Sequence, residues 1–360
     1  MLSASLPFDL LAQCYCAFPP KGNFLFCRHC DFDRQSKCDM MSGFLSTTDF
    51  VGLHTWRLLM AVINIGSMNI DHVYTVEHFV KPGETLHSQK LELHPGGKGL
   101  NQSIALAKAG VQVKHAGLLG NGGAYLKEEL ENYGVNTDWI RDVEGQNGHS
   151  MIQVQPDGQN SIVLYGGSNM KFTDGFIDEV VSHADDDDVV LLQNEINDIP
   201  RIIEQAKTRG LKVVFNAAPC TEQVKDYPLH LLDLLIINEV EGAMLSGETD
   251  FDKVLGTLKE RYPNTGIVLT LGSGGVYYAD ANGVLKVAAC RVKNVVDTTS
   301  AGDTFTGYMM SEWLKGSPME TCLSLACTAS AVCIQKAGSS TSIPFPKELP
   351  VSETEAAAIA

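Results

Sequence analysis

Residues 297–304, with the sequence DTTSAGDT, organise the fold because they join a turn to the start of a helix. The apolar pair at 295–296 just before this stretch is expected to end a strand. After it, Phe305, Met309 and Trp313 recur at helical spacing. The sequence therefore predicts a strand, a turn of small residues and a helix, in that order.

The predicted helix start also has a chemical meaning. Its first residues, 300–302, leave backbone N–H groups unpaired and aimed outward. These amides and the positive end of the helix dipole attract anions, and small side chains let a phosphate approach closely. Asp303 would stand beside that phosphate, where its carboxylate can take a proton from an attacking hydroxyl. The stretch indicates a phosphotransferase; the alternative is that Asp303 only complements the helix dipole.

A second glycine-rich stretch, HPGGKGLNQ at residues 94–102, precedes another apolar helical pattern that includes Ile104 and Leu106. Three glycines within four residues let the backbone approach a ligand closely. The spacing fits neither the P-loop, with four residues between its glycines, nor the dinucleotide fingerprint. Two separate glycine-containing helix starts are therefore expected.

Together the two stretches resemble the two signatures of the ribokinase-like (PfkB) family of sugar kinases. Other motifs follow the family's order along the chain: GSMNID at 66–71, NAAP at 216–219, NEVE at 238–241 and TLGS at 270–273. The resemblance covers roughly residues 58–346. Within the family, Asn69 and Asp71 together with Asn101 and Gln102 favour the kinases that act on ribose.

Composition sets bounds on the class of protein. The chain has 360 residues, of which 44% are hydrophobic and 19% charged, enough to bury a substantial core. The net charge of −16 argues against a nucleic-acid or membrane surface, which needs clustered Lys and Arg, and no apolar run is long enough for a transmembrane helix. We expect a cytoplasmic protein without nucleic-acid or membrane partners, with the nucleus as an alternative for a eukaryotic source.

Ten cysteines are spread unevenly along the chain. Five of them lie in apolar surroundings and are expected to be reduced core thiols: Cys220, Cys290, Cys322, Cys327 and Cys333. The others lie within residues 1–56, which match nothing in the family and lack the features of a signal or transit peptide. A zinc site there is a minor alternative, because the cysteine pairs are closer together than in common structural sites.

The rest of the chain alternates between β and α patterns. Continuous apolar runs predict strands at 58–65, 113–119, 189–192, 213–215, 234–237 and 267–271. Helices are predicted at 124–133, 199–209, 239–246 and 251–261. This alternation indicates an α/β fold, a doubly wound and mostly parallel sheet flanked by helices. Gly66, Asn216, Asn238 and Gly272 follow strand ends, so their motifs should meet at one edge of the sheet.

Four further segments, 73–79, 89–93, 149–155 and 161–165, alternate or turn like exposed strands. In the resembled family such strands form a small β lid over the sugar, and this lid also pairs two subunits into a homodimer. The alternative is that these segments are ordinary loops between the elements of the main fold. The expected domains are an extension at 1–56, a kinase domain at 57–350 with lid segments near 70–95 and 149–167, and a tail at 351–360.

The resemblance implies roles for individual residues. Asp303 would be the general base, and the amides of Ala301 and Gly302 would stabilise charge on the transferred phosphoryl group. The polar positions that match the family's sugar contacts are Asn69, Asp71, Gly97, Lys98, Asn101, Glu195 and Asp303. Carboxylates accept hydrogen bonds from hydroxyls and Asn can both donate and accept, which suits a polyol. An exposed loop lysine is the equally plausible interpretation of Lys98.

The nucleotide side is implied in the same way. The positions that match ATP contacts are Asn238, Thr270, Gly272, Gly275, Gly302 and Cys327. Glu241 would help to position Mg²⁺ through water, because Mg²⁺ dehydrates reluctantly. Asn238 and Glu241 also have the spacing of a helix capping box, and both interpretations can hold together.

A monovalent cation is the last implied ligand. The positions that correspond to the family's potassium loop, mostly through main-chain oxygens, are Asp297, Thr299, Cys333, Lys336, Gly338 and Ser342. One carboxylate with several carbonyls suits a large, weakly hydrated cation better than Mg²⁺.

The resemblance implies an ATP-dependent kinase that converts D-ribose into D-ribose 5-phosphate, with Mg²⁺ and K⁺ as cofactors. Pocket shape rather than these motifs sets specificity, so deoxyribose, fructose and adenosine are alternative substrates. A non-catalytic sugar-binding protein is the alternative from another class, because fold does not imply function.

Overall fold

The computed structural model describes residues 60–156 and 158–350, which belong to one compact unit of the chain. The predicted extension, its zinc alternative and the tail lie outside the described residues. Within those residues, no helix is long and apolar enough to cross a membrane.

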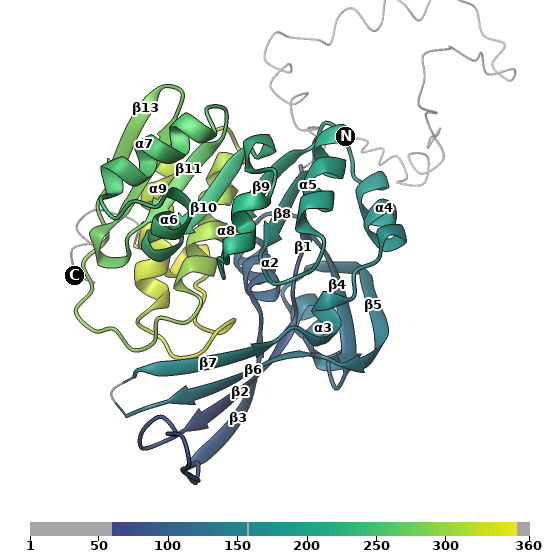
Figure 1. The fold of residues 1–360 in the computed structure, drawn as a ribbon, viewed down its shortest axis with the longest axis vertical. Helices are drawn as coiled ribbons and strands as arrows, with labels where there is room; N and C mark the ends of the chain where they lie inside the picture. Colours follow the sequence, from purple (N-terminus) through teal and green to yellow (C-terminus); the bar gives the residue numbers. More distant parts are fainter. Residues whose placement is uncertain (1–59, 157, 351–360) are drawn as a thin grey trace, which may run out of the picture. The chain divides into compact units, whose positions relative to one another are not determined.

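A nine-stranded sheet forms the centre of this unit (Figure 1). Its strands are, in spatial order, β13 (Gly283–Val287), β12 (Val276–Asp280), β11 (Gly266–Thr270), β10 (Leu234–Asn238), β9 (Lys212–Asn216), β8 (Val189–Gln193), β1 (Val62–Ile65), β4 (Val113–Asn121) and β5 (Asn136–Gln146). From β11 to β5 all neighbours pair in parallel, whereas β12 and β13 pair antiparallel. The predicted mostly parallel sheet is confirmed.

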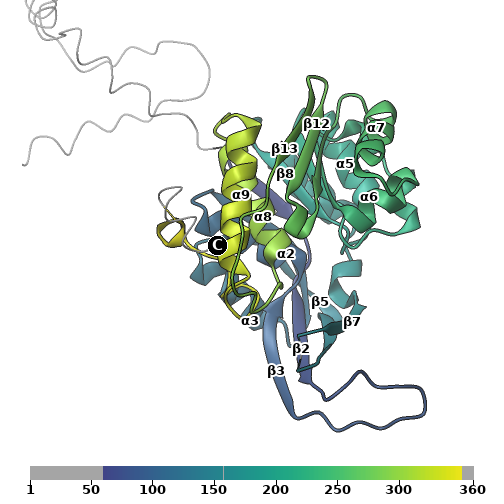
Figure 2. The same ribbon diagram turned by 90° about the vertical axis from the view of Figure 1, so that its left-hand side faces the viewer.

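Helices cover both faces of this sheet (Figures 1 and 2). One layer consists of α4 (Asp174–Ser182), α5 (Ile199–Thr208), α6 (Glu239–Ser246) and α7 (Phe251–Arg261). The other consists of α2 (Lys98–Lys108), α3 (Ala124–Asn132), α8 (Ala301–Trp313) and α9 (Met319–Cys333). Successive side chains of a strand point to opposite faces, so Ile63 packs in the first layer and Val62 in the second.

Helices α2 and α8 pack closely in the second layer. A Cβ atom on Gly307 of α8 would lie 2.5 Å from the Cβ of Ala105 in α2. At the end of α2, the buried Lys108 ammonium donates to the carbonyls of Ser340 and Ile343, each at 2.8 Å. Burial lowers the pKa of Lys108 to about 8. Helix α2 therefore connects the glycine-rich stretch at its start to a C-terminal loop at its end.

A separate four-stranded sheet, which we call the lid, contains the predicted exposed strands (Figure 1). Its spatial order is β3 (Lys90–Gly96), β2 (Asn69–Thr75), β6 (Gly148–Val154) and β7 (Asn160–Tyr165). Strands β2 and β6 pair in parallel, and the two outer pairs are antiparallel.

Some predicted bounds are wrong. Val295 and Val296 do not end a strand: their side chains are 59% and 57% exposed, and the backbone N–H of Val296 donates to the Ile334 carbonyl at the end of α9. This segment crosses from an edge strand to α8 and has no neighbouring strand to pair with. The strand predicted at 73–79 ends at Thr75, where its pairing with β3 and β6 ends. The first strand begins at Val62 rather than at residue 58, and β5, β12 and β13 were not predicted.

Candidate active site

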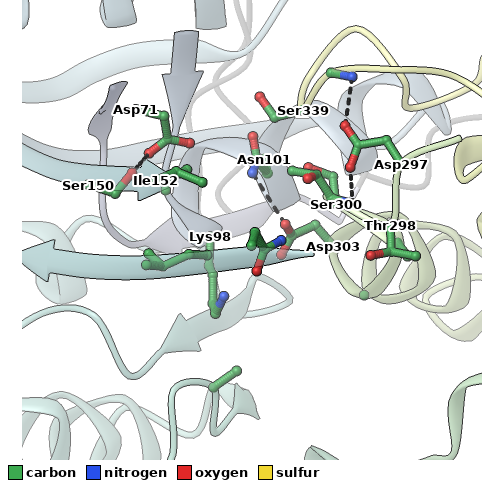
Figure 3. A pocket seen from close by; sticks show the side chains of 18 of the residues that line it. Asp71, Lys98, Asn101, Ser150, Ile152, Asp297, Thr298, Ser300, Asp303 and Ser339 are labelled. Carbon is green, nitrogen blue, oxygen red and sulfur yellow. Dashed lines mark hydrogen bonds between the residues drawn. The ribbon is translucent and has the colours of Figure 1, made fainter. Parts of the chain in front are cut away.

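A cavity of about 1200 Å³ opens between the lid and the carboxyl edge of the main sheet. Asn216, Asn238 and Thr270, at the ends of three neighbouring strands, line one side of it. Asp71 and Ser150 of the lid line another side (Figure 3). The convergence expected at the carboxyl edge of a parallel sheet is therefore present, and the starts of α2 and α8 also line the cavity.

Asp303 lies buried in the first turn of α8, at the cavity (Figure 3). Its carboxylate accepts hydrogen bonds from Gln102 Nε2 at 2.9 Å and from Asn101 Nδ2 at 3.3 Å. Burial raises the pKa of Asp303, while the positive charge of Lys98 and these two hydrogen bonds oppose that shift. A carboxyl group with a raised pKa beside a cavity is suited to general base chemistry.

The start of α8 presents backbone amides next to this carboxylate. Ser300 precedes the helix in the left-handed region, with φ of 59°, and its side chain does not cap the helix. Within the described part of the chain, the N–H groups of Gly302 and Asp303 have no hydrogen-bond partner. The Ala301 N–H donates to the Thr298 carbonyl at 3.3 Å. The predicted anion site therefore keeps the Gly302 amide, whereas the Ala301 amide already has a long hydrogen bond.

Lys98 and Glu195 form a charged pair at the start of α2. Glu195 Oε2 accepts hydrogen bonds from the Lys98 backbone N–H at 3.0 Å and from Ser67 Oγ at 2.5 Å, and Glu195 Oε1 lies 3.7 Å from Lys98 Nζ. Burial acts to lower the pKa of Lys98, but the carboxylates of Glu195, Asp303, Glu241 and Asp71 outweigh it and raise this pKa. Lys98 is therefore half-buried and lines the cavity, with its ammonium near the Glu195 carboxylate.

Two polar side chains of β2 face the cavity from the lid side. Asp71 accepts a hydrogen bond from Ser150 of β6, and burial raises its pKa to about 6. Asn69 Oδ1 accepts a hydrogen bond from Asn169 Nδ2 at 2.7 Å. Both predicted sugar contacts thus lie on a lid strand, which begins at Asn69.

The glycines of the second stretch are required by close packing. Gly97 has φ of 93° and precedes the first residue of α2. A Cβ atom on Gly96 would lie 1.9 Å from Asp71 Oδ2, and one on Gly99 would lie 2.4 Å from the Ser67 backbone nitrogen. Larger side chains would push the helix start away from β2.

The motif at residues 238–241 forms the capping box that its spacing allowed. Asn238 Oδ1 accepts from the backbone N–H groups of Val240 and Glu241, each at 2.9 Å, and Glu241 Oε2 accepts from the Asn238 N–H at 2.9 Å. Burial raises the pKa of Glu241. Both residues and Thr270 line the cavity, so capping and ligand binding are compatible.

The remaining predicted nucleotide positions, Gly272, Gly275 and Cys327, are not among the residues that line the cavity. Gly272 and Gly275 follow β11 with φ of 52° and 91°. A Cβ atom on Gly275 would lie 2.2 Å from the Val287 carbonyl oxygen, so this turn packs tightly against β13. Cys327 of α9 does not line the cavity; burial raises the pKa of its thiol to about 12.

Asp297, labelled in Figure 3, joins two segments of the predicted cation loop. Its carboxylate accepts hydrogen bonds from the backbone N–H groups of Thr299 at 2.9 Å and Gly338 at 3.0 Å. Cys333 Sγ lies 3.2 Å from Ser342 Oγ and 3.8 Å from the Thr299 carbonyl oxygen. Both oxygens of the Asp297 carboxylate therefore accept backbone N–H groups, while Cys333 contacts both the Thr299 carbonyl and Ser342. The Lys336 side chain instead pairs with Glu348, so only its main chain could take part.

The sequence model of the pfkB family of carbohydrate kinases matches residues 61–346. The chain belongs to this family. Its curated relatives in the pfkB family include the ribokinase of Staphylococcus aureus (strain COL), which is 33% identical over 303 residues, or 80% of this chain and 98% of that protein. Ribokinase of Haemophilus influenzae is 31% identical over 294 residues, or 79% of this chain and 95% of that protein.

Solved structures of ribokinases resemble this fold. The crystal structure of ribokinase from Cryptococcus neoformans var. grubii serotype A in complex with ADP has a TM-score of 0.71 and 32% identity, covering 80% of this chain and 98% of that chain. Arabidopsis thaliana ribokinase complexed with ribose and ATP has a TM-score of 0.71 and 29% identity, covering 81% and 97%.

Sequence motifs of the pfkB family did not identify the partners of the site residues. Ser150 and Asn169, which hold the two β2 side chains, lie in unremarkable sequence. Ser150 is placed by the pairing of β6 with β2, and Asn169 lies in a short 3-10 helix, Gly167–Met170. Ser67 and Gln102 lie inside recognised motifs, but nothing in the sequence assigns them to Glu195 or Asp303. These contacts depend on tertiary pairing.

Proposed function

We propose that this pfkB family member is an ATP-dependent kinase that phosphorylates D-ribose at its 5-hydroxyl, giving D-ribose 5-phosphate and ADP. The observation that carries the proposal is the buried Asp303 carboxyl beside the free Gly302 amide, at a cavity lined by polar lid residues. Relatives that share about a third of their residues over most of this chain are ribokinases, which supports ribose as the substrate.

In the proposed reaction, the Asp303 carboxylate takes the proton of the ribose 5-hydroxyl. The hydroxyl oxygen forms a bond to the γ-phosphorus of ATP, the bond from that phosphorus to the β,γ-bridging oxygen breaks, and ADP leaves with the electron pair. The Gly302 N–H and the Lys98 ammonium would stabilise negative charge on the transferred group. Asn69, Asp71, Gly97, Asn101 and Glu195 are the proposed sugar contacts.

ATP is proposed to lie along the ends of β10 and β11, beside Asn238, Thr270 and the turn that contains Gly272 and Gly275. Glu241 fits the proposed Mg²⁺, which would neutralise phosphate charge when bound. Its Oε2 is held by the Asn238 N–H, while Oε1 has no hydrogen-bond partner within the described residues and can accept from a water of the hydrated ion.

A monovalent cation, K⁺, is proposed beside Asp297, with the main-chain oxygens of Thr299, Cys333, Lys336, Gly338 and the Ser342 group around it. The same loop leads into α8, so a cation here would neutralise charge near the phosphoryl site without touching the reacting atoms.

A homodimer through the lid and a cytoplasmic location are also proposed. Leu93, His72, Met151 and Val163 form one row across the four strands, on the face opposite Asp71 and Ser150. Leu93, Met151 and Val163 are between 49% and 65% exposed, which is unusual for a free sheet face. The free thiols of all five described cysteines support a reducing compartment.

The test is ADP release by the purified protein with ATP and Mg²⁺, in K⁺ or Na⁺ buffer, across ribose, deoxyribose, fructose and adenosine. We expect a strong preference for ribose and a higher rate in K⁺. Asp303→Asn should lower kcat by at least about 100-fold while ribose binding, measured by calorimetry, persists. Turnover of another acceptor would reassign the substrate, and folded protein that binds ribose without turnover would favour the sugar-binding alternative.

A further inference from the structure

A line of buried amide side chains leads from the main sheet to Asp303. Gln193, at the end of β8, is fully buried, and its Nε2 donates to Gln102 Oε1 at 2.8 Å. Gln102 in turn donates from Nε2 to Asp303 Oδ1 at 2.9 Å. Gln193 Nε2 also donates to Asn64 Oδ1 of β1 at 3.0 Å. Three amides therefore connect two central strands with the carboxyl group at the cavity.

The far end of this line is fixed by the backbone. Asn64 Nδ2 donates to the Gly99 carbonyl at 2.7 Å and to Ser103 Oγ at 2.8 Å. Because both of its N–H groups are used, the Asn64 oxygen must face Gln193, and Gln193 must present its NH₂ group to both Asn64 and Gln102. This sets the orientation of each amide in turn.

The same logic prevents Gln102 from turning over. A reversed Gln102 amide would place its oxygen against the Asp303 carboxylate and its NH₂ group against the NH₂ group of Gln193. Two unfavourable contacts would then replace two hydrogen bonds between the fully buried Gln102 and Gln193 and the mostly buried Asp303, where such contacts are costly. Gln193 thereby holds Gln102 in the orientation that donates to Asp303.

We propose that Gln193 is a positioning residue for the kinase reaction, which acts through Gln102 to hold the Asp303 carboxylate in its proton-accepting orientation. This inference rests on the proposed function. The line of amides carries no charge, so it orients the carboxylate without neutralising it. It also ties that orientation to Gly99, so the glycine-rich stretch and the general base are set by one network.

The test compares Gln193→Met with Ser103→Ala in the purified full-length protein. Methionine keeps the length of the side chain but cannot donate to Gln102. Ser103 is equally buried and lies on the branch that leads from Asn64 to His115, away from Asp303. Without its hydroxyl, Asn64 Nδ2 still donates to the Gly99 carbonyl, so the orientation of Asn64 is kept. Both variants remove buried hydrogen bonds, and only the first removes one on the path to the general base.

For Gln193→Met we expect kcat with ribose to fall by between about 10-fold and 100-fold, with KM for ribose changed little. The acid limb of its kcat profile should move to higher pH, because the weakened hydrogen bond from Gln102 no longer favours the ionised Asp303. Lys98 and Glu195 are the charged groups that act on Asp303 from α2 and from the loop after β8, and both are unchanged. Ser103→Ala should keep the wild-type kcat and pH profile.

Combining Gln193→Met with Asp303→Asn makes the test specific. If Gln193 acts through Asp303, its replacement should change the residual single-turnover rate of Asp303→Asn by less than about 2-fold. If Gln193→Met reduced the rate of Asp303→Asn by the same factor as it reduces the rate of the wild type, the proposal would be overturned. A Gln193→Met enzyme with the kcat and pH profile of the wild type would also overturn it. Absence of turnover in the wild type would instead overturn the proposed function, and the role of Gln193 with it.

Should Gln193→Met fail to fold, Gln193→Glu replaces it. Its protonated carboxyl can donate to Gln102, whereas the ionised form presents only acceptors to both Gln102 and Asn64. We therefore expect its kcat to fall as pH rises over a range in which the wild-type kcat rises or stays level. A wild-type profile for this variant would overturn the proposal.

Discussion

Asp71 and Asp303 are two buried carboxyl groups at one cavity, but their surroundings differ. Asp303 is held by two amides next to a free helix start, whereas Asp71 accepts from the Ser150 hydroxyl on the lid. Burial raises the pKa of both. For Asp71 this pKa is about 6, so ionisation of its buried carboxyl lowers the free energy of unfolding near neutral pH.

The folded-state pKa of Asp71 lies above the ordinary aspartate pKa of 3.8, so the protein binds this proton more tightly when folded. The favourable contribution is complete below about pH 4 and is lost as pH rises through about 6. Asp71→Asn should therefore raise the free energy of unfolding by about 1 to 3 kcal/mol at pH 7.5 and by much less at pH 4.5. Urea denaturation at both pH values checks this. An equal gain at the two values would show that ionisation of Asp71 is not the cause.

At the residue scale, the sequence could identify the groups that carry chemistry but not the groups that hold them. Asp303 and Asn101 stand in motifs whose residue types and spacing have a chemical explanation. Ser150 and Gln193 do not: Ser150 meets Asp71, and Gln193 meets Asn64, because two strands far apart in the sequence pair side by side. Local patterns contain no information about such pairing.

At the scale of elements, α2 and α8 meet so closely that their starts move together. Gly307→Ala would place a methyl group 2.5 Å from the Ala105 Cβ and force the helices apart. We expect a loss of about 1 to 3 kcal/mol in stability and a lower kcat, because Asp303 on α8 would shift from Gln102 on α2. Thermal unfolding and steady-state kinetics measure both effects.

Gly256 of α7 provides the matched control. A Cβ atom there meets no other atom within 4 Å, so Gly256→Ala should raise stability by up to about 1 kcal/mol through helix propensity alone and leave kcat unchanged. Similar losses in the two variants would mean that the contact between α2 and α8 is not what makes Gly307 necessary.

Predictions of elements succeeded where one physical cause dominated. The bounds of α6 and α7 were predicted to the residue, because Asn238 and Asp250 cap these helices and Gly247 ends α6 in the left-handed region. Val295 and Val296 were misassigned because an apolar pair indicates burial only on average, and here both side chains remain exposed at the cavity. Propensity cannot show whether a partner strand is available.

At the scale of the whole described unit, the lid is the part whose strand pairing could not be predicted from the sequence. Alternating residues predicted strands, but the parallel pairing of β2 with β6, which makes a single sheet, joins segments about 80 residues apart and has no local signal. One face of the folded lid lines the cavity. The other face carries the row of Leu93, His72, Met151 and Val163, which we call the apolar row after its three exposed apolar members.

We expect that apolar row to form the dimer interface. Val163→Lys should therefore convert a dimer into a monomer in sedimentation or light-scattering measurements, because a buried charge without a partner is costly. Val284→Lys is the control: this valine of β13 is similarly exposed, at 56% against 65%, but lies outside the lid. A monomeric wild type, or a dimer that tolerates Val163→Lys, would contradict the proposed interface.

The length of α2 has a consequence for how this gene can change. The helix begins at Lys98, beside the cavity. It ends at Lys108, whose ammonium donates hydrogen bonds to two carbonyls of the C-terminal loop. Each residue of a helix advances about 1.5 Å and turns about 100°. Removing or adding one codon between these lysines would swing one end away from its partners, whereas many single-base substitutions would not. Every residue of this helix is buried or half-buried, so mutational scanning should find that it accepts conservative substitutions only and no in-frame insertion or deletion.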